Sequence, residues 1–220
     1  MGSRPLFFKP LTGEIKTMKI FTNHRYAMIT GIVLAVVLSV VLSTVTGDGA
    51  SFRNLSLARW VHVVSGVFWI GLLYYLNAVQ VPGQAAATED KGGPGPAAIG
   101  KYIAPRALFW FRWSALATWL AGAWLLGANF VPAFTLSASL DTFSMYHLVI
   151  GIGAWLGTIM LLNVWGVIWP NQKRVLGIVQ ATDEEKAKAR KTALYASRTN
   201  FILSIPMLLC MAGATHGLPF

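Results

Sequence analysis

Three of the four histidines lie in or beside long apolar segments of the 220-residue chain. His62 lies in WVHVVSGVFWIG, His147 near the beginning of a later apolar segment, and His216 near the end of the last one. Imidazole is a common ligand of transition metals and of haem, and ionisable residues inside membrane spans are usually functional. The fourth histidine, His24, lies among basic residues, and we interpret it as an interfacial residue.

The residues around these histidines favour haem over a bare metal ion. Three imidazoles without a nearby carboxylate or thiolate could bind copper or zinc, whereas two imidazoles on opposed helices could bind a b-type haem. Aromatic rings flank the histidines and glycines leave flat space beside the helices, although both residue types also pack helices together. The residues concerned are Phe68, Trp69, Trp155, Gly66, Gly151 and Gly153.

We therefore predict a cofactor site with His62 and His147 as metal ligands. Arg59 precedes His62 by about one helical turn, so it could pair with a haem propionate or extend to the membrane surface. The predicted cofactor-binding residues are His62, His147, His216 and Arg59.

A second polar group surrounds Arg112, which lies in the apolar stretch FWFRW. A charge inside a membrane span needs a partner, and three amide residues occur at a similar depth. Either Arg112 bonds to these amides and locks the bundle, or the four residues form a polar or anion-binding site beside Trp110 and Trp113. The four residues are Arg112, Asn77, Asn163 and Asn200.

Composition places the chain among integral membrane proteins. Hydrophobic residues make up 55% and charged residues 12%, whereas soluble domains carry about 25% charged residues. Five segments have about the length that a spanning helix needs. We predict an all-α bundle of five transmembrane helices in a single membrane domain, residues 26–220, after a basic amphipathic arm, residues 1–25. The predicted spans are Tyr26–Gly47, Leu57–Val81, Ala107–Phe130, Met145–Trp169 and Thr199–His216.

The distribution of Lys and Arg predicts the orientation of these spans. Basic residues concentrate in the arm and in the second and fourth connections, so these parts are predicted to be cytoplasmic, with the N-terminus inside and the C-terminus outside. This bias also accounts for the net charge of +10 without requiring a nucleic-acid partner.

Two of the connections have compositions that predict their structure. Residues 82–105 have the composition of a flexible linker. Thr182 and Glu185 form a capping box that predicts a short cytoplasmic helix leading into the fifth span.

This topology places the polar residues in two layers. His62, His147 and His216 fall in the outer layer, at depths that agree to within about 8 Å. Arg112 and the amides fall near the cytoplasmic side.

The chain has a single cysteine, Cys210, which allows no internal disulfide. It also has no C-x-x-C-H motif for covalent haem attachment.

Four stretches resemble the membrane domain of bacterial membrane-bound urate oxidases, the PuuD type. They are WVHVVSGVFWIG, FWFRWSALATWLAG, NVWGVIWPNQKR and SRTNFILSIPMLLCM. The resemblance implies an oxidase of purine catabolism in the bacterial inner membrane, whose membrane domain is followed by a periplasmic c-type cytochrome. This sequence ends at Phe220, so we expect it to lack the cytochrome domain, and it has Thr199 where the family has a histidine.

Three functions are compatible with these features. The first is a redox or electron-transfer protein with a b-type haem or metal in the outer layer, working with a separate c-type cytochrome. The second is a urate-oxidase-like enzyme with Arg112 and the amides near the substrate. The third is a non-catalytic accessory or scaffold subunit of a larger respiratory or photosynthetic membrane complex.

Overall fold

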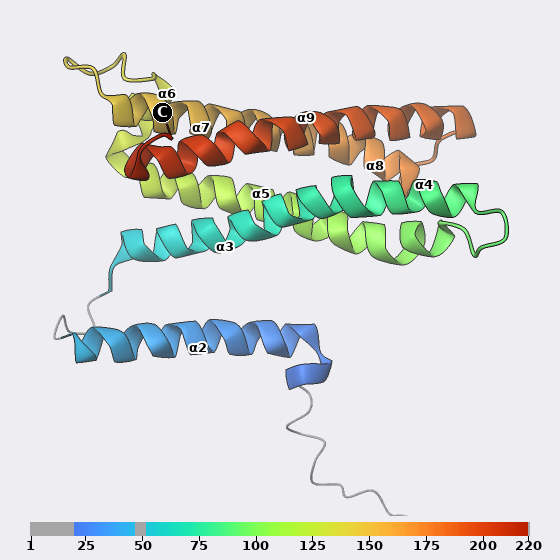
Figure 1. Ribbon diagram of the computed structural model, residues 1–220, viewed down its shortest axis with the longest axis horizontal. Coiled ribbons are helices and arrows are strands. Elements are labelled where there is room, and N and C mark those ends of the chain that lie inside the picture. Colours follow the sequence, from blue (N-terminus) through green and yellow to red (C-terminus); the bar gives the residue numbers. More distant parts are fainter. Residues whose placement is uncertain (1–19, 47–51, 220) are drawn as a thin grey trace, which may run out of the picture. The chain divides into compact units, whose positions relative to one another are not determined.

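The computed structural model describes residues 20–46 and 52–219, and all regular elements within these ranges are helices (Figure 1). Most of the predicted basic arm, residues 1–25, lies outside the described residues. The chain divides into two compact units, Met1–Arg53 and Asn54–Phe220. The predicted all-helical membrane fold is confirmed, since five helices are long and apolar enough to cross a bilayer. These are His24–Val45, Asn54–Glu89, Ile99–Phe134, Met145–Val175 and Asp183–His216.

The first unit contains one long helix, α2 (His24–Val45). Its N-terminus is capped by Asn23, whose side chain accepts a hydrogen bond from the backbone N–H of Arg25. None of its residues is buried, and its valines, leucines and isoleucines are exposed all round. A helix that is apolar on every face is stable in a lipid environment.

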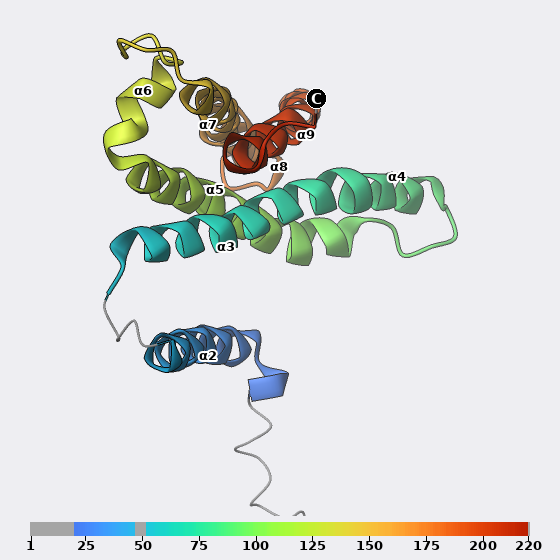
Figure 2. The ribbon, with the colours of Figure 1, turned by 60° about the vertical axis from the view of Figure 1, so that its left-hand side comes forward.

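The second unit is built from two pairs of long helices. Figure 2 shows α3 lying along α5 and α7 lying along α9, and these are the closest-packed pairs. Trp69, Leu73, Phe111, Met160 and Val164 form the centre of the apolar core between them. The helices are α3 (Asn54–Tyr75), α4 (Val81–Glu89), α5 (Ala104–Leu126), α6 (Phe130–Phe134), α7 (Met145–Asn163), α8 (Trp169–Val175) and α9 (Asp183–His216).

Three short π-helical segments, each followed by a proline, interrupt these helices. They are η1 (Leu76–Gln80), η2 (Ile99–Ile103) and η4 (Val164–Ile168), and a 3-10 turn, η3 (Gly127–Asn129), follows α5. The prolines occupy the first turns of α4, α5 and α8. Proline cannot donate to the carbonyl four residues earlier and its ring clashes with that carbonyl, so a local widening of the helix accommodates it.

This accommodation corrects the prediction of a flexible linker over residues 82–105. The helix of the second span continues through Pro82 to Glu89, and the next helix already begins at Ile99. Only the residues between them form a connection. The π-helical segments η1 and η2 accommodate Pro82 and Pro105, so neither proline ends its helix.

The predicted capping box before α9 is confirmed. The Thr182 side chain accepts from the backbone N–H of Glu185 at 3.2 Å, and the Glu185 carboxylate accepts from the backbone N–H of Thr182 at 2.7 Å. The helix that begins here is longer than predicted, because it continues without interruption through Pro206 to His216. The predicted short helix and the fifth span are therefore one element.

Candidate functional site

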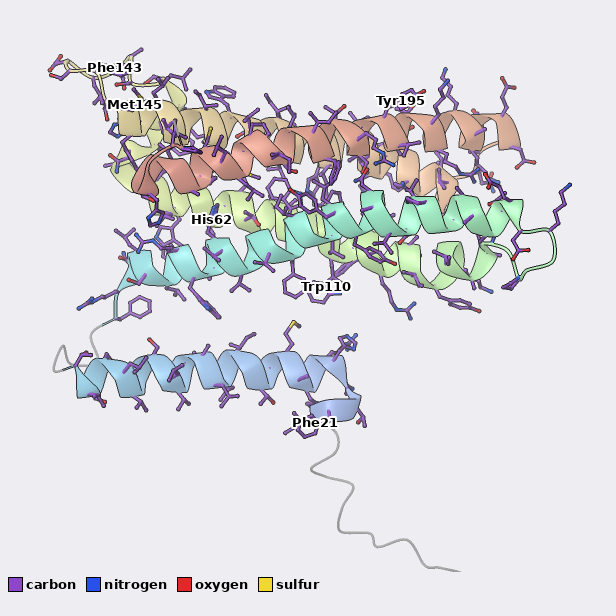
Figure 3. All side chains as sticks on the ribbon, viewed as in Figure 1. Phe21, His62, Trp110, Phe143, Met145 and Tyr195 are labelled. Atoms are coloured by element: carbon purple, nitrogen blue, oxygen red, sulfur yellow. The ribbon has the colours of Figure 1, made fainter. Side chains whose placement is uncertain are left out.

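His62 lies on α3 with its ring held against α5. Its Nδ1 is 2.8 Å from the backbone carbonyl oxygen of Thr118. A carbonyl oxygen can only accept a hydrogen bond, so Nδ1 must carry the proton, and the neutral ring then keeps its lone pair on Nε2. No hydrogen bond to Nε2 is found within residues 52–219. Figure 3 places His62 toward the end of the bundle where α3 begins.

Gly122 on α5 makes this close approach possible. A Cβ atom at this position would lie 2.9 Å from Cε1 and 3.0 Å from Nδ1 of His62. Both distances are shorter than van der Waals contact, so any larger residue would displace the ring from the Thr118 carbonyl. Gly122 and Thr118 lie four residues apart and therefore on one face of α5.

His147 lies at the beginning of α7, and both of its ring nitrogens have partners. Nε2 is 3.0 Å from Oδ1 of Asn129, and Nδ1 is 2.8 Å from the hydroxyl oxygen of Ser144. The amide oxygen accepts, so Nε2 donates, and Nδ1 accepts from the Ser144 hydroxyl. Ser144 also caps α7 by accepting from the backbone N–H of His147. His147 therefore ties the start of α7 to the loop after α5.

The predicted ligands lie toward one end of the second unit, but the structure does not bring them into one cluster. In Figure 1, α3 and α7 begin and α9 ends at the same end of this unit. His216, the last residue of α9, and Arg59 are both exposed. No hydrogen bond or ring contact joins His62 to His147, and the described part of the chain contains no group of three His, Cys, Asp or Glu residues able to hold a metal ion. A copper or zinc site made by three histidines is therefore not assembled.

Helix packing fills the flat space predicted beside the glycines. A side chain at Gly151 would collide with the backbone of Ala133 on α6. One at Gly153 would lie 3.1 Å from Cys210 and 3.3 Å from Met211 of α9. The predicted aromatic residues are dispersed, since Trp155 donates to the Phe134 carbonyl at 3.0 Å and Phe68 stacks on Trp110 with ring centroids 5.6 Å apart.

Asn163 and Asn200 connect the end of α7 to the middle of α9. Asn163 Nδ2 donates to the Ala196 carbonyl and to Oδ1 of Asn200, both at 2.8 Å, and Asn200 Nδ2 donates to the Met160 carbonyl at 3.0 Å. Asn200 is fully buried. The two side chains thus form a network of hydrogen bonds that joins the two helices.

Asn77 lies in η1 and connects it to α9. Its Nδ2 donates to the Leu73 carbonyl at 2.8 Å and to the Ser197 hydroxyl at 2.9 Å. The Leu73 carbonyl fixes the orientation of the amide, because only the nitrogen can donate to it. The opposite atom, Oδ1, is buried and has no hydrogen-bond partner among the described residues.

Arg112 does not join these amides. Its guanidinium lies 3.8 Å from the ring centroid of Trp169 and 5.4 Å from that of Phe109. Both contacts are cation–π interactions, which stabilise the charge without using its N–H groups. The predicted layer of four residues therefore contains two separate arrangements: the amides, which bond between helices, and Arg112, which packs on aromatic rings.

Sequence reasoning did not identify Thr118, Gly122, Asn129 and Ser197 as partners of the predicted residues. Thr118 acts through its backbone carbonyl, which every residue carries, and Gly122 acts through the absence of a side chain. Ser144 did carry a signal, because a serine directly before an apolar helix is a typical N-cap.

Residues 128–220 match the family described as urate oxidase N-terminal. The predicted resemblance is confirmed over this part of the chain, which includes His147, Asn163, Asn200 and His216. No curated protein and no solved structure matches the chain.

Proposed function

We propose, from the relation of residues 128–220 to the urate oxidase N-terminal family, that the chain is a membrane-embedded redox protein in which His62 would hold a b-type haem. The observation that most directly supports this proposal is the hydrogen bonding of the His62 ring. Nδ1 donates to the Thr118 carbonyl, and Nε2 keeps an unshared electron pair.

The environment of His62 fits that of a metal-bound histidine. Ligating histidines usually donate their second ring N–H to a carbonyl or carboxylate, which fixes the tautomer and the orientation of the ring. Thr118 provides this acceptor and Gly122 provides the space. Arg59 lies three residues before His62, on the same face of α3, and is the candidate partner for a propionate.

His147 fits the ligand role less well, because both of its ring nitrogens already have hydrogen-bond partners. The predicted metal pair of His62 and His147 would require the bond between Nε2 and Asn129 to break. We therefore assign the first ligand to His62, and we assign His147 to positioning the start of α7.

A bound b-type haem would supply one-electron chemistry near the end of the bundle that is predicted to face the periplasm. The protein side chains would orient this group, and the surrounding helices would limit the access of water. A separate c-type cytochrome or a larger membrane complex is the proposed electron partner, and the bacterial inner membrane is the proposed location.

The visible absorption spectrum of the full chain, purified in mild detergent from cells supplied with haem precursor, tests this proposal. We expect Soret and α bands in the wild type, loss of these bands in His62→Gln, and retention in His147→Gln. Metal analysis of the same samples distinguishes haem iron from copper or zinc. A colourless wild type, or a spectrum that His62→Gln leaves unchanged, would contradict the proposal.

The family match itself favours a second candidate, a urate-oxidase-like oxidoreductase that passes electrons to a separate cytochrome. Urate added to membranes containing the chain and a c-type cytochrome should then cause reduction of the cytochrome. A chain carrying His62→Gln serves as the matched control. Equal reduction with and without the chain would exclude this activity.

The composition of α2 favours a third candidate, an accessory subunit of a larger complex. Apolar residues cover every face of this helix, so it could pack against the transmembrane helices of a partner. Such a subunit should co-purify with a stable complex through mild detergent, whereas the redox protein should purify alone with its pigment.

A further inference from the structure

Arg112 is a charged residue in a membrane span whose hydrogen-bond donors are not used by the fold. The guanidinium is held over the Trp169 ring at 3.8 Å, and no hydrogen bond from it is found in the ranges 20–46 and 52–219. The ion pair found in these ranges joins Lys186 to Asp183, so no carboxylate neutralises Arg112. A guanidinium whose N–H groups have no partner can bind an oxyanion through two parallel N–H donors.

The direction of the side chain places this charge toward one boundary of the membrane. Side chains on a helix lean toward its N-terminus, so Arg112 leans toward Arg106 and the start of α5, about 9 Å away along the helix axis. This is the end where the sequence predicts the cytoplasm. Long cationic side chains reach the polar boundary in this manner while their stems stay in the apolar layer.

Lys173 adds a second positive charge on the same side. It follows Trp169 by four residues on α8, and residues at this spacing lie on one face of a helix. The Trp169 ring therefore has Arg112 stacked on it and Lys173 one turn beyond. Two cations without carboxylate partners at the edge of the apolar layer attract an anion.

The surroundings of Arg112 favour a lipid over a dissolved anion. Phe109, whose ring centroid lies 5.4 Å from the guanidinium, is 46% exposed, and Trp113, the residue after Arg112 on α5, is 47% exposed. Exposed aromatic rings next to a cation present an apolar surface for an acyl chain beside a charged group for its phosphate.

We propose that Arg112, with Lys173, binds the phosphate of an anionic phospholipid at the boundary of the bilayer. This site is independent of His62, because it lies nearer the opposite end of the bundle and joins a different part of α5 to α8. Free inorganic phosphate offers the same oxyanion chemistry, so the experiment must distinguish the two sources.

The test measures binding of phosphatidylglycerol, phosphatidylcholine and inorganic phosphate to the full chain in mild detergent, by native mass spectrometry. We expect the wild type to retain phosphatidylglycerol in preference to phosphatidylcholine. Arg112→Gln should weaken phosphatidylglycerol binding about tenfold, the loss expected for one charge-assisted contact. Lys173→Gln should weaken phosphatidylglycerol binding less, because a lysine ammonium cannot donate two parallel hydrogen bonds to one phosphate.

Arg106→Gln is the matched control, since it removes the same charge from the same helix. The Arg106 guanidinium already donates to the Tyr102 carbonyl, so we expect phosphatidylglycerol binding to change little.

Three outcomes would overturn the proposal. Equal losses of lipid binding in the two arginine variants would mean that only the net positive charge of the protein matters. Tight binding of inorganic phosphate that displaces the lipid would also overturn it in favour of a dissolved anion. If Arg112→Gln does not fold, an unchanged affinity in Lys173→Gln would reject the site.

Discussion

The amide cluster (Asn163 and Asn200) and His62 both place polar groups inside the bundle, but they use their hydrogen-bonding capacity differently. Asn163 and Asn200 bond to each other and to carbonyls of the facing helices. Among the described residues His62 makes one bond, to the Thr118 carbonyl, and its opposite nitrogen has no partner there. The amides thus hold helices together, whereas His62 keeps an electron pair available for a ligand.

The difference shows how a polar residue in a membrane bundle can be interpreted. An unsatisfied polar group is costly in an apolar interior, so a fold that only needed stability would use every donor and acceptor. Where the fold leaves one group unused and still orients it, the group is a candidate for chemistry. His147 shows the contrast, because its two nitrogens are used at the start of α7.

The largest effect should come from breaking the amide cluster. Asn200→Leu removes the bond to the Met160 carbonyl and the bond from Asn163, and we expect it to lower the free energy of unfolding by about 1–3 kcal/mol. Unfolding of the full chain in mixed micelles, followed by circular dichroism, measures this change. The matched control is Asn171→Leu, because Asn171 Nδ2 donates only within its own helical segment, to Val167. Similar losses in both variants would show that the bonds between α7 and α9 do not stabilise the bundle.

A smaller effect should follow from crowding the His62 ring. Gly122→Ala puts a methyl group 2.9 Å from Cε1 of His62, and we expect a destabilisation of about 1–2 kcal/mol as the ring moves. The same variant should weaken or shift the haem bands expected of the wild type. Gly71→Ala is the matched control, because nothing lies within 4 Å of its added Cβ and alanine favours the helix by about 0.5–1 kcal/mol. An unchanged stability and spectrum in Gly122→Ala would mean that the ring is not held against α5.

The five spans could be predicted from sequence because the bilayer imposes a simple requirement. Each span must be apolar over about 20 residues and must satisfy its own backbone hydrogen bonds. The ends of the spans were predicted less well. Pro82 was interpreted as the end of a span, but η1 absorbs the proline and the helix continues to Glu89. The effect of a proline depends on whether the preceding turn can widen, which the sequence does not state.

The site residues were chosen by type and depth, without their direction. A rise of 1.5 Å per residue gives the depth of a side chain, so Arg112 and the amides were treated as candidate polar residues of one layer. Rotation about the helix axis decides what each side chain touches, and packing between helices sets that rotation. Arg112 therefore contacts Trp169 and Phe109, while Asn163 and Asn200 contact each other.

The smallest effect should come from Asn77, although it is as deeply buried as Asn200. Asn77→Leu removes the bonds to Leu73 and Ser197 and also removes Oδ1, a buried acceptor without a partner in the described ranges. The two changes oppose each other, since an unsatisfied buried group is itself costly, so we expect a change of less than about 1 kcal/mol. The same unfolding measurement compares this variant with Asn200→Leu. A loss as large as that of Asn200→Leu would mean that Oδ1 has a partner, such as an ordered water molecule bound between η1 and α9. Asn77 would then resemble His62 in binding a group from outside the fold.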